Sequence, residues 1–278
     1  MKMRSKLLAL TLTFTAAAWM PLAAQADQVA DIKAKGELVC GVLGTDDPFS
    51  FVDPKTREIV GYEVDLCNAI AKKIGVKATL KQLAVAARVP ELQQGRVDIL
   101  AASLTHNKER EALIDFSLST FITGQKVMVK KSSGITQPSQ LAGQKVLTVK
   151  GSTMEQNMKK AVPTAEIVSF DNSPQAFLAL QQGKGVAYVN DETSLIDDYS
   201  KLGPAQSQYV ILPASISTEH LALGLKKGEA GMKALVDGVL RDMEKSGEAD
   251  KLFTKWFGPE TKMKFMSRPF KYETDKID

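Results

Sequence analysis

The segment GYEVDLCNAIAKKIGVKATLKQL, residues 61–83, changes its periodicity halfway and so joins two kinds of secondary structure. From Val64 to Ile74 its apolar residues recur at spacings of three and four, which is typical of the buried face of a helix. Gly75 follows in the position of a helix C-cap. Lys77–Leu83 has the composition of a strand. The segment therefore predicts a helix that leads directly into a strand.

The flanking residues extend this unit into an alternating series. Glu37–Val42 is a predicted strand before the helix. A short helix over Val89–Gln94, closed by Gly95, and a strand over Val97–Ala101 follow it. The order β-α-β-α-β favours a mostly parallel sheet covered by helices.

The same construction recurs about a hundred residues later. Predicted strands at Lys145–Val149, Glu166–Phe170 and Val186–Asn190 alternate with helices at Thr153–Ala161 and Pro174–Gln182. Asp171 or Ser173 would cap the second of these helices. LQQGR at 92–96 and LQQGK at 180–184 are nearly the same sequence, each a helix end, a glycine and a basic residue. The chain thus reads as two similar α/β lobes.

Two extended segments, Phe121–Lys131 and Thr218–Lys226, lie at the junctions of these lobes. Gly231–Phe257 is a helical pattern after the second junction. A chain that crosses to a second lobe and returns forms a hinge of two strands. The cleft between two such lobes is a natural ligand site.

The N-terminus has the pattern of a secretory signal. Lys2, Arg4 and Lys6 precede an apolar stretch at 7–20 that is too short to span a bilayer comfortably. Ala24-Gln25-Ala26 supplies a small-x-small cleavage site, so we expect cleavage after Ala26 and a periplasmic mature protein. An uncleaved membrane anchor is the alternative.

Charge and cysteine content limit the possible partners. The formal net charge of +4 falls to about +1 without the three positive charges of the signal, and no basic stripe remains. Nucleic-acid binding is therefore not expected. Cys40, in a predicted strand, and Cys67, on the next helix, are compatible with one disulfide in an exported protein. Two small buried thiols are the alternative.

No motif for catalysis is found. His106 and His220 have no nucleophile in a recognisable setting, and the histidines and cysteines match no zinc pattern. Gly41-Val42-Leu43-Gly44 is neither a dinucleotide fingerprint nor a phosphate loop. Asp46-Asp47 would suit a metal or an acid–base pair, although adjacent loop acids are more often solvated or capping. We expect no cofactor, no metal and no enzymatic activity.

Gly61-Tyr62-Glu63-Val64-Asp65-Leu66, followed by Ile70-Ala71 and Ile74, resembles the signature of the bacterial extracellular solute-binding proteins of family 3. These are the polar amino-acid receptors of ABC importers. The resemblance runs through the mature chain to Lys255-Trp256-Phe257-Gly258 and is strongest to members that bind glutamate and aspartate.

This resemblance implies a type II periplasmic binding protein with two hinged α/β lobes. The first lobe would comprise 27–122 and 219–278, and the second lobe 123–218. The ligand, a free amino acid, would favour a closed form because both lobes touch it only there. The closed form would dock on a membrane ABC permease. We expect a monomer.

The resemblance also implies which residues bind the α-carboxylate of the ligand. Arg110 matches the arginine that grips the α-carboxylate, for which a guanidinium fork is suited. Its alternative is a surface ion pair with Glu109, Glu111 or Asp115. Ser103 and Thr105 would complete the carboxylate cradle; otherwise they are polar residues at a strand end.

Two residues of the second lobe have matching roles. Asp191 corresponds to the aspartate that binds the α-ammonium, although it also stands where it would N-cap a helix over Glu192–Tyr199. Thr153, after Gly151-Ser152, corresponds to a residue that closes over the carboxylate, with a plain N-cap as its alternative.

Arg88 bears on specificity. It stands where the family points a residue at the ligand side chain, and an arginine there is able to pair with a side-chain carboxylate; a solvated helix residue is the alternative. Three departures weaken this preference for an acidic ligand. The loop at 41–44 lacks a second basic residue, Asp46-Asp47 replaces an aromatic, and Val186 replaces an aspartate.

Two other functions occur on related scaffolds. A periplasmic dehydratase resembling cyclohexadienyl dehydratase would need a carboxylic acid in the cleft with a raised pKa, and Asp191 would be the candidate. A ligand-sensing ectodomain would continue into a transmembrane helix, which this sequence does not have before Asp278.

Overall fold

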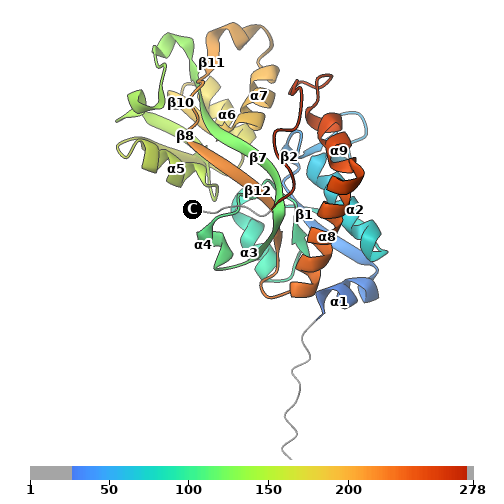
Figure 1. Ribbon diagram of the computed structural model, residues 1–278. Helices are drawn as coiled ribbons and strands as arrows, with labels where there is room; N and C mark the ends of the chain where they lie inside the picture. Colours follow the sequence, from blue (N-terminus) through green and yellow to red (C-terminus); the bar gives the residue numbers. More distant parts are fainter. Residues whose placement is uncertain (1–26, 274–278) are drawn as a thin grey trace, which may run out of the picture.

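The computed structural model describes residues 27–273. The predicted signal at 1–26 and its cleavage site lie outside these residues. Within residues 27–273, no helix combines the length and the apolar character that crossing a membrane requires. The described chain forms two α/β bodies with a pair of long strands running between them (Figure 1). This is the type II binding-protein architecture that the sequence predicts.

One continuous sheet passes through both bodies in the order β5-β1-β6-β12-β7-β10-β8-β9, and β11 pairs with β7. At its centre lie the two crossing strands, β7 (Asp115–Lys130) and β12 (Ser217–Leu225), which pair antiparallel along most of their length. On either side of them, β1 pairs parallel with β5 and β6, and β8 pairs parallel with β9 and β10. The predicted crossings are confirmed, although β7 begins earlier than expected.

The first body is built from segments before and after the second. Its parts before the first crossing are α1 (Gln28–Lys35), β1 (Glu37–Val42), β2 (Thr45–Asp46), β3 (Ser50–Val52), β4 (Ile59–Val60), α2 (Tyr62–Ile74), β5 (Lys77–Gln82), α3 (Arg88–Gln93), β6 (Ile99–Leu100) and α4 (Lys108–Glu111). After the return crossing it adds α8 (Ala230–Ser246) and α9 (Glu248–Phe257). β2, β3 and β4 form a small antiparallel sheet of their own.

The second body lies between the crossings. It consists of β8 (Lys145–Val149), α5 (Met154–Ala161), β9 (Glu166–Phe170), α6 (Ser173–Gln181), β10 (Ala187–Asp191), α7 (Glu192–Lys201) and β11 (Tyr209–Ile211). Neither expected cap of α6 is used, because the Asn172 side chain accepts the hydrogen bond from the backbone N–H of Gln175, at 3.0 Å.

Separate hydrophobic cores support the two bodies. One cluster of buried side chains draws on residues 32–121 and 221–272, and another draws on residues 127–212. We refer to 27–122 with 219–273 as the first lobe and to 123–218 as the second lobe. These boundaries remain the prediction made from the sequence.

The motif glycine Gly61 begins α2 at a point of close backbone contact. Its φ is 147°, and a Cβ atom there would lie 2.1 Å from the carbonyl oxygen of Phe49. Only glycine fits this approach. Behind it, Tyr62 and Phe49 are fully buried and meet edge to face, at 6.2 Å between ring centroids. The motif thus anchors the loop that carries Asp46 and Asp47.

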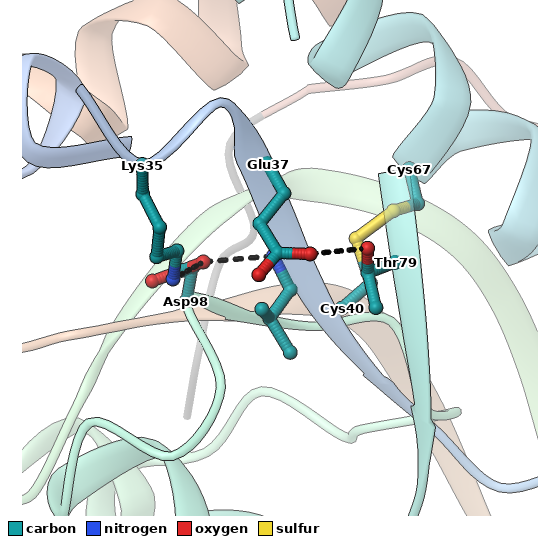
Figure 2. Close-up of a disulfide and its surroundings, with 7 residues drawn as sticks. Lys35, Glu37, Cys40, Cys67, Thr79 and Asp98 are labelled. Carbon is teal, nitrogen blue, oxygen red and sulfur yellow. Dashed lines mark hydrogen bonds and ion pairs between the residues drawn. A yellow bond between two sulfur atoms is a disulfide. The ribbon is translucent and has the colours of Figure 1, made fainter. Parts of the chain in front are cut away.

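A disulfide joins Cys40 on β1 to Cys67 on α2, with Cα atoms 6.5 Å apart (Figure 2). This confirms the pairing that the sequence left open. Beside it, Glu37 accepts a hydrogen bond from Thr79 on β5 at 2.6 Å, and Asp98 binds both Lys35 and the backbone N–H of Val39. The disulfide joins α2 to β1, the Glu37–Thr79 hydrogen bond joins β1 to β5, and Asp98 joins α1 to β1.

The predicted C-terminal helical pattern is two helices, because Gly247 adopts a left-handed conformation between α8 and α9. Residues 259–273, here called the C-terminal tail, then pack back on the first lobe. The tail's Arg268 forms ion pairs with Glu244 and Asp250. Farther along, the hydroxyl of Tyr272 lies 2.7 Å from that of Tyr62.

Candidate functional site

A cavity between the lobes brings together all six residues that the sequence predicts for a ligand site: Arg88, Ser103, Thr105, Arg110, Thr153 and Asp191. The first four come from the first lobe and the last two from the second. Ser103 follows β6, Thr153 follows β8, and Asp191 ends β10. Because ligands of open α/β sheets bind at the carboxyl ends of the strands, this is the expected place.

Arg110 on α4 directs its guanidinium at the junction of the lobes. One nitrogen, Nη1, donates to the carbonyl of Thr105 at 2.7 Å, and Nη2 donates to the carbonyl of Gly151 in the second lobe at 3.2 Å. Burial lowers the pKa of Arg110 below its usual value. An anion in the cavity would therefore be favourable.

The three acids proposed as surface partners of Arg110 have other partners. Glu109 accepts from Gln156 at 2.9 Å, and Glu111 lies 2.8 Å from the ring of His106. The carboxylate of Asp115 pairs with Lys227 at 2.8 Å. The hydrogen bonds of the Arg110 guanidinium therefore go to backbone carbonyls rather than to these acids.

Arg88, at the start of α3, is buried with 4% of its surface exposed, so it is not a solvated helix residue. Its Nε donates to the carbonyl of Val85 at 2.9 Å, and Nη1 donates to the carbonyls of Ala102 and Ser103 at 2.8 and 2.9 Å. A longer bond of 3.3 Å joins Nη2 to Gly151. A guanidinium has five N–H donors, so one on Nη2 remains for a ligand acceptor. Burial, followed by the charge of Arg110, lowers the pKa of Arg88 to about 9.

Ser103 is held in a left-handed conformation, with φ 48°, by the buried carboxylate of Glu63. Both oxygens of Glu63 accept from the backbone N–H of Ser103, at 3.0 and 2.9 Å. Burial raises the pKa of Glu63 to about 8. The acidic residue of the motif thus positions the cavity wall, which the sequence does not reveal.

Asp191 is the N-cap residue of α7, yet its side chain makes no capping hydrogen bond. The carboxyl is buried, and its Oδ1 has no hydrogen-bond partner among residues 27–273. Burial, then the charges of Glu219 and Asp46, raise the pKa of Asp191 to about 8. A buried carboxyl oxygen without a hydrogen-bond partner is costly, and a cationic ligand group would satisfy it.

Thr153 belongs to a hydrogen-bond network at the hinge. Its hydroxyl donates to Glu219 on β12 at 2.8 Å and accepts from Gln125 on β7 at 2.9 Å. It also lies 3.4 Å from the hydroxyl of Thr105, across the lobe junction. Thr153 is also the N-cap residue of α5, but its side chain makes no capping hydrogen bond to that helix.

Asp46 lines the cavity, whereas Asp47 faces the C-terminal tail. The Asp46 carboxylate accepts from the hydroxyl of Ser103 in its own lobe and from that of Ser194 on α7, the latter at 2.8 Å. Burial raises the pKa of Asp46. Asp47 pairs with Lys262. The two adjacent acids therefore meet the second lobe or the tail rather than bulk solvent.

The cavity combines two guanidinium groups, a carboxyl without a full set of partners, and several hydroxyls. Such an array has the chemistry that a zwitterion would require, a cationic donor for a carboxylate and a carboxyl group for an ammonium. Residues 27–273 contain no group of three or more histidine, cysteine or acidic side chains arranged to hold a metal ion.

The sequence did not predict several other polar residues of the cavity wall: Gln125 on the first crossing strand, Ser173 and Asn190, and Ser194 on α7. It did not predict Glu219 either, which is buried on the second crossing strand beside Thr153. Both crossing strands hold several other polar residues, so no local signal in the sequence distinguishes Gln125 and Glu219.

Comparison with known proteins agrees with this geometry. The sequence profile of the bacterial extracellular solute-binding proteins, family 3, matches residues 38–259. The ABC transporter glutamine-binding protein GlnH of Bacillus subtilis (strain 168) is 33% identical over 83% of this chain and 84% of its own length.

Two further relatives have other ligands in their names. The L-glutamate/L-aspartate-binding protein of Pseudomonas aeruginosa is 29% identical over 81% of this chain and 78% of its own. The solved structure of an ancestral arginine-binding protein bound to arginine is 34% identical, with a TM-score of 0.75 over 80% of this chain and 99% of that one.

Proposed function

The chain belongs to the bacterial extracellular solute-binding proteins of family 3, and from this premise we propose that it captures one free L-amino acid between its lobes and delivers it to an ABC importer. It is a solute-binding receptor rather than an enzyme. The observation that carries the proposal is the unpaired, buried Oδ1 of Asp191 in the same cavity as Arg110. These two groups suit the ammonium and the carboxylate of an amino acid.

In this proposal Arg110 binds the α-carboxylate, together with Thr105, Ser103 and the start of α5 at Thr153. The hydrogen bonds of Arg110 and Arg88 to Gly151 join the lobes at this point. A ligand carboxylate that arrives there meets donors from both lobes. Closure is then favoured because only the closed form presents all of these donors together.

For the ligand's side chain we propose an acidic preference, for glutamate or aspartate, set by Arg88. The remaining N–H of Arg88 is available to a side-chain oxygen, and an anion would offset the cost of its buried charge. The kinship with a glutamate/aspartate-binding protein supports this assignment.

Glutamine is the second candidate. Glu63 and Asp46 lie near Arg88 and already counter its charge, so a neutral amide oxygen would suffice for the remaining donor. The kinship with glutamine-binding proteins supports this alternative.

The proposal extends to the place of action. Family members are extracellular or periplasmic, and we propose that the signal is cleaved after Ala26 to release a monomer into the periplasm. Its permease partner would recognise the closed form.

A thermal-shift screen of the mature protein against the twenty amino acids tests this function. We expect stabilisation by glutamate or aspartate, with glutamine next, because a ligand that binds only the native state raises the melting temperature. Arg110→Ala should lose the response to every amino acid, with affinity at least about 100-fold weaker. If no amino acid stabilises the wild-type protein, the proposal fails.

A further inference from the structure

The C-terminal tail follows α9 and is fastened to the first lobe along its length. Arg268 pairs with Glu244 and Asp250, and Phe270 packs in the first core cluster. The backbone N–H of Ser119 on β7 donates to the carbonyl of Glu273 at 2.8 Å. Nearly the whole tail lies beyond residue 259, where the family profile ends. It is therefore a fixed part of the first lobe in this chain.

One residue of the tail reaches the second lobe. The ammonium of Lys262 forms ion pairs with Asp47 of the first lobe and with Asp197 on α7 of the second lobe. The Asp197 side chain is 5% exposed and that of Lys262 is 32% exposed, so water only partly screens the contact.

The same face of α7 makes a second contact across the lobes. Ser194, almost one helical turn before Asp197, donates to Asp46 at 2.8 Å. α7 begins directly after Asp191, the proposed ammonium ligand. One short helix thus connects the ligand cavity to the adjacent acids and to the tail.

We propose that Lys262 is an interlobe latch, which gains its ion pair with Asp197 only when the lobes close and thereby raises ligand affinity. This inference rests on the proposed function, because it requires lobes that exchange between an open and a closed form, with the closed form partly populated in the absence of ligand. Asp47 holds the lysine in position on the first lobe, and Asp197 is the moving partner.

The contribution of the latch should be moderate. When the lobes open, Lys262 keeps Asp47, and Asp197 keeps Lys201, its partner one turn along α7. Opening therefore breaks one ion pair and leaves no buried charge without a partner. Partly exposed ion pairs of this kind change an equilibrium about 3- to 10-fold at low salt.

Lys262→Met tests the latch, because methionine keeps the aliphatic stem and removes the charge. Lys271→Met is the matched control, since it removes the same charge from an exposed position on the same tail. We expect calorimetric titration with the amino acid found in the screen to show about 3- to 10-fold weaker binding for Lys262→Met at about 20 mM NaCl. The loss should shrink at about 500 mM NaCl, and Lys271→Met should bind like the wild type.

A double-mutant cycle with Asp197→Asn isolates the pair. The two substitutions should be strongly non-additive, and Lys262→Arg should restore affinity. Equal affinities for Lys262→Met and Lys271→Met at both salt concentrations would overturn the proposal, whether or not Asp197→Asn folds.

Small-angle scattering of the ligand-free protein separates a failed latch from a failed function. A wild-type protein that binds no amino acid refutes the proposed function, but scattering still measures how closed the lobes are. The latch predicts a larger radius of gyration for Lys262→Met than for Lys271→Met at low salt. If the wild-type protein binds no amino acid, identical radii for the two variants reject the latch.

Discussion

At the scale of single residues, the cavity contains buried ionisable groups that lower the stability of the ligand-free protein. Asp191 and Glu63 are both buried carboxyls, and burial raises the pKa of each to about 8. Arg88 is a buried cation whose hydrogen bonds go to backbone carbonyls. Buried groups of this kind reduce the stability of the ligand-free protein, and under the proposed function Asp191 and Arg88 would offset that cost by binding ligand.

Asp191→Asn should abolish amino-acid binding and stabilise the ligand-free protein at high pH. The raised pKa means that folded Asp191 retains its proton between about pH 4 and 8 while the unfolded chain releases it. The wild-type free energy of unfolding therefore falls as pH rises through this range. Asparagine does not titrate, so we expect the free energy of unfolding of Asp191→Asn to exceed that of the wild type by about 1–3 kcal/mol at pH 8. This difference should vanish near pH 4.

Urea unfolding from pH 4 to 9 measures this difference. Asp242→Asn, on the exposed surface of α8, is the control and should leave the pH profile unchanged. A pH profile for Asp191→Asn that runs parallel to that of the wild type would show that Asp191 does not cause the decrease in the free energy of unfolding at high pH.

Arg88→Met should alter ligand preference as well as affinity. Methionine keeps the volume of the stem but cannot pair with a side-chain oxygen, so the ratio of glutamate to glutamine affinity should fall about 10-fold or more. The carbonyls of Ala102 and Ser103 also lose a donor, so some loss of stability is expected.

The affinity ratio, measured by calorimetry, is the decisive quantity because a general loss of stability cancels in it. Arg110→Lys should weaken both ligands alike and serves as the comparison. If the ratio is the same in Arg88→Met and the wild type, Arg88 has a structural role and the acidic preference is wrong.

At the scale of elements, periodicity and glycine positions predicted most of the order along the chain. β8 and β9 have the predicted bounds, and α2 ends before Gly75 as expected. Short elements were harder: β6 has only two residues, and α1 and the small sheet of β2, β3 and β4 were not anticipated. Such elements bury few side chains, so their sequence pattern is weak and tertiary contacts establish them.

At the scale of the whole molecule, the two lobes contact each other at Gly151. Gly151, in the loop between β8 and α5, has φ 76°, and a Cβ atom there would lie 2.6 Å from the Cα of Ala86 in the first lobe. Its carbonyl accepts hydrogen bonds from both Arg88 and Arg110. The two lobes are therefore in a closed arrangement, and this close contact requires a residue without a Cβ atom at position 151.

Gly151→Ala should hinder closure without unfolding either lobe. The new methyl group meets backbone of the opposite lobe, which does not give way as a flexible side chain would. We expect ligand affinity to fall about 10-fold or more, and the ligand-induced decrease in radius of gyration to be reduced.

Gly183→Ala is the matched control for this substitution. Gly183 has a similar φ of 72° in the same lobe, but a Cβ atom there would have no heavy atom within 4 Å. It shares the backbone strain and lacks the interlobe contact. Equal ligand affinities in the two variants would refute the role of Gly151 in closure.

The sequence by itself determined the main α/β element order, the two crossings, the family and six of the residues that meet in the cavity. It could do so because each rests on local periodicity or on a short motif, and because strand ends in such sheets converge. Even the disulfide partners were limited to one pair, since the chain has two cysteines.

Only the tertiary structure decided what the polar groups at the lobe junction do. Asp46 meets Ser194 at a sequence separation of 148 residues, and Asp47 meets Lys262 at 215. The burial of Glu63 against Ser103 and the unpaired oxygen of Asp191 are likewise results of tertiary packing. No local pattern encodes such contacts, because they form between side chains that are individually compatible with solvent and become partners only when distant segments of the chain come together in the fold.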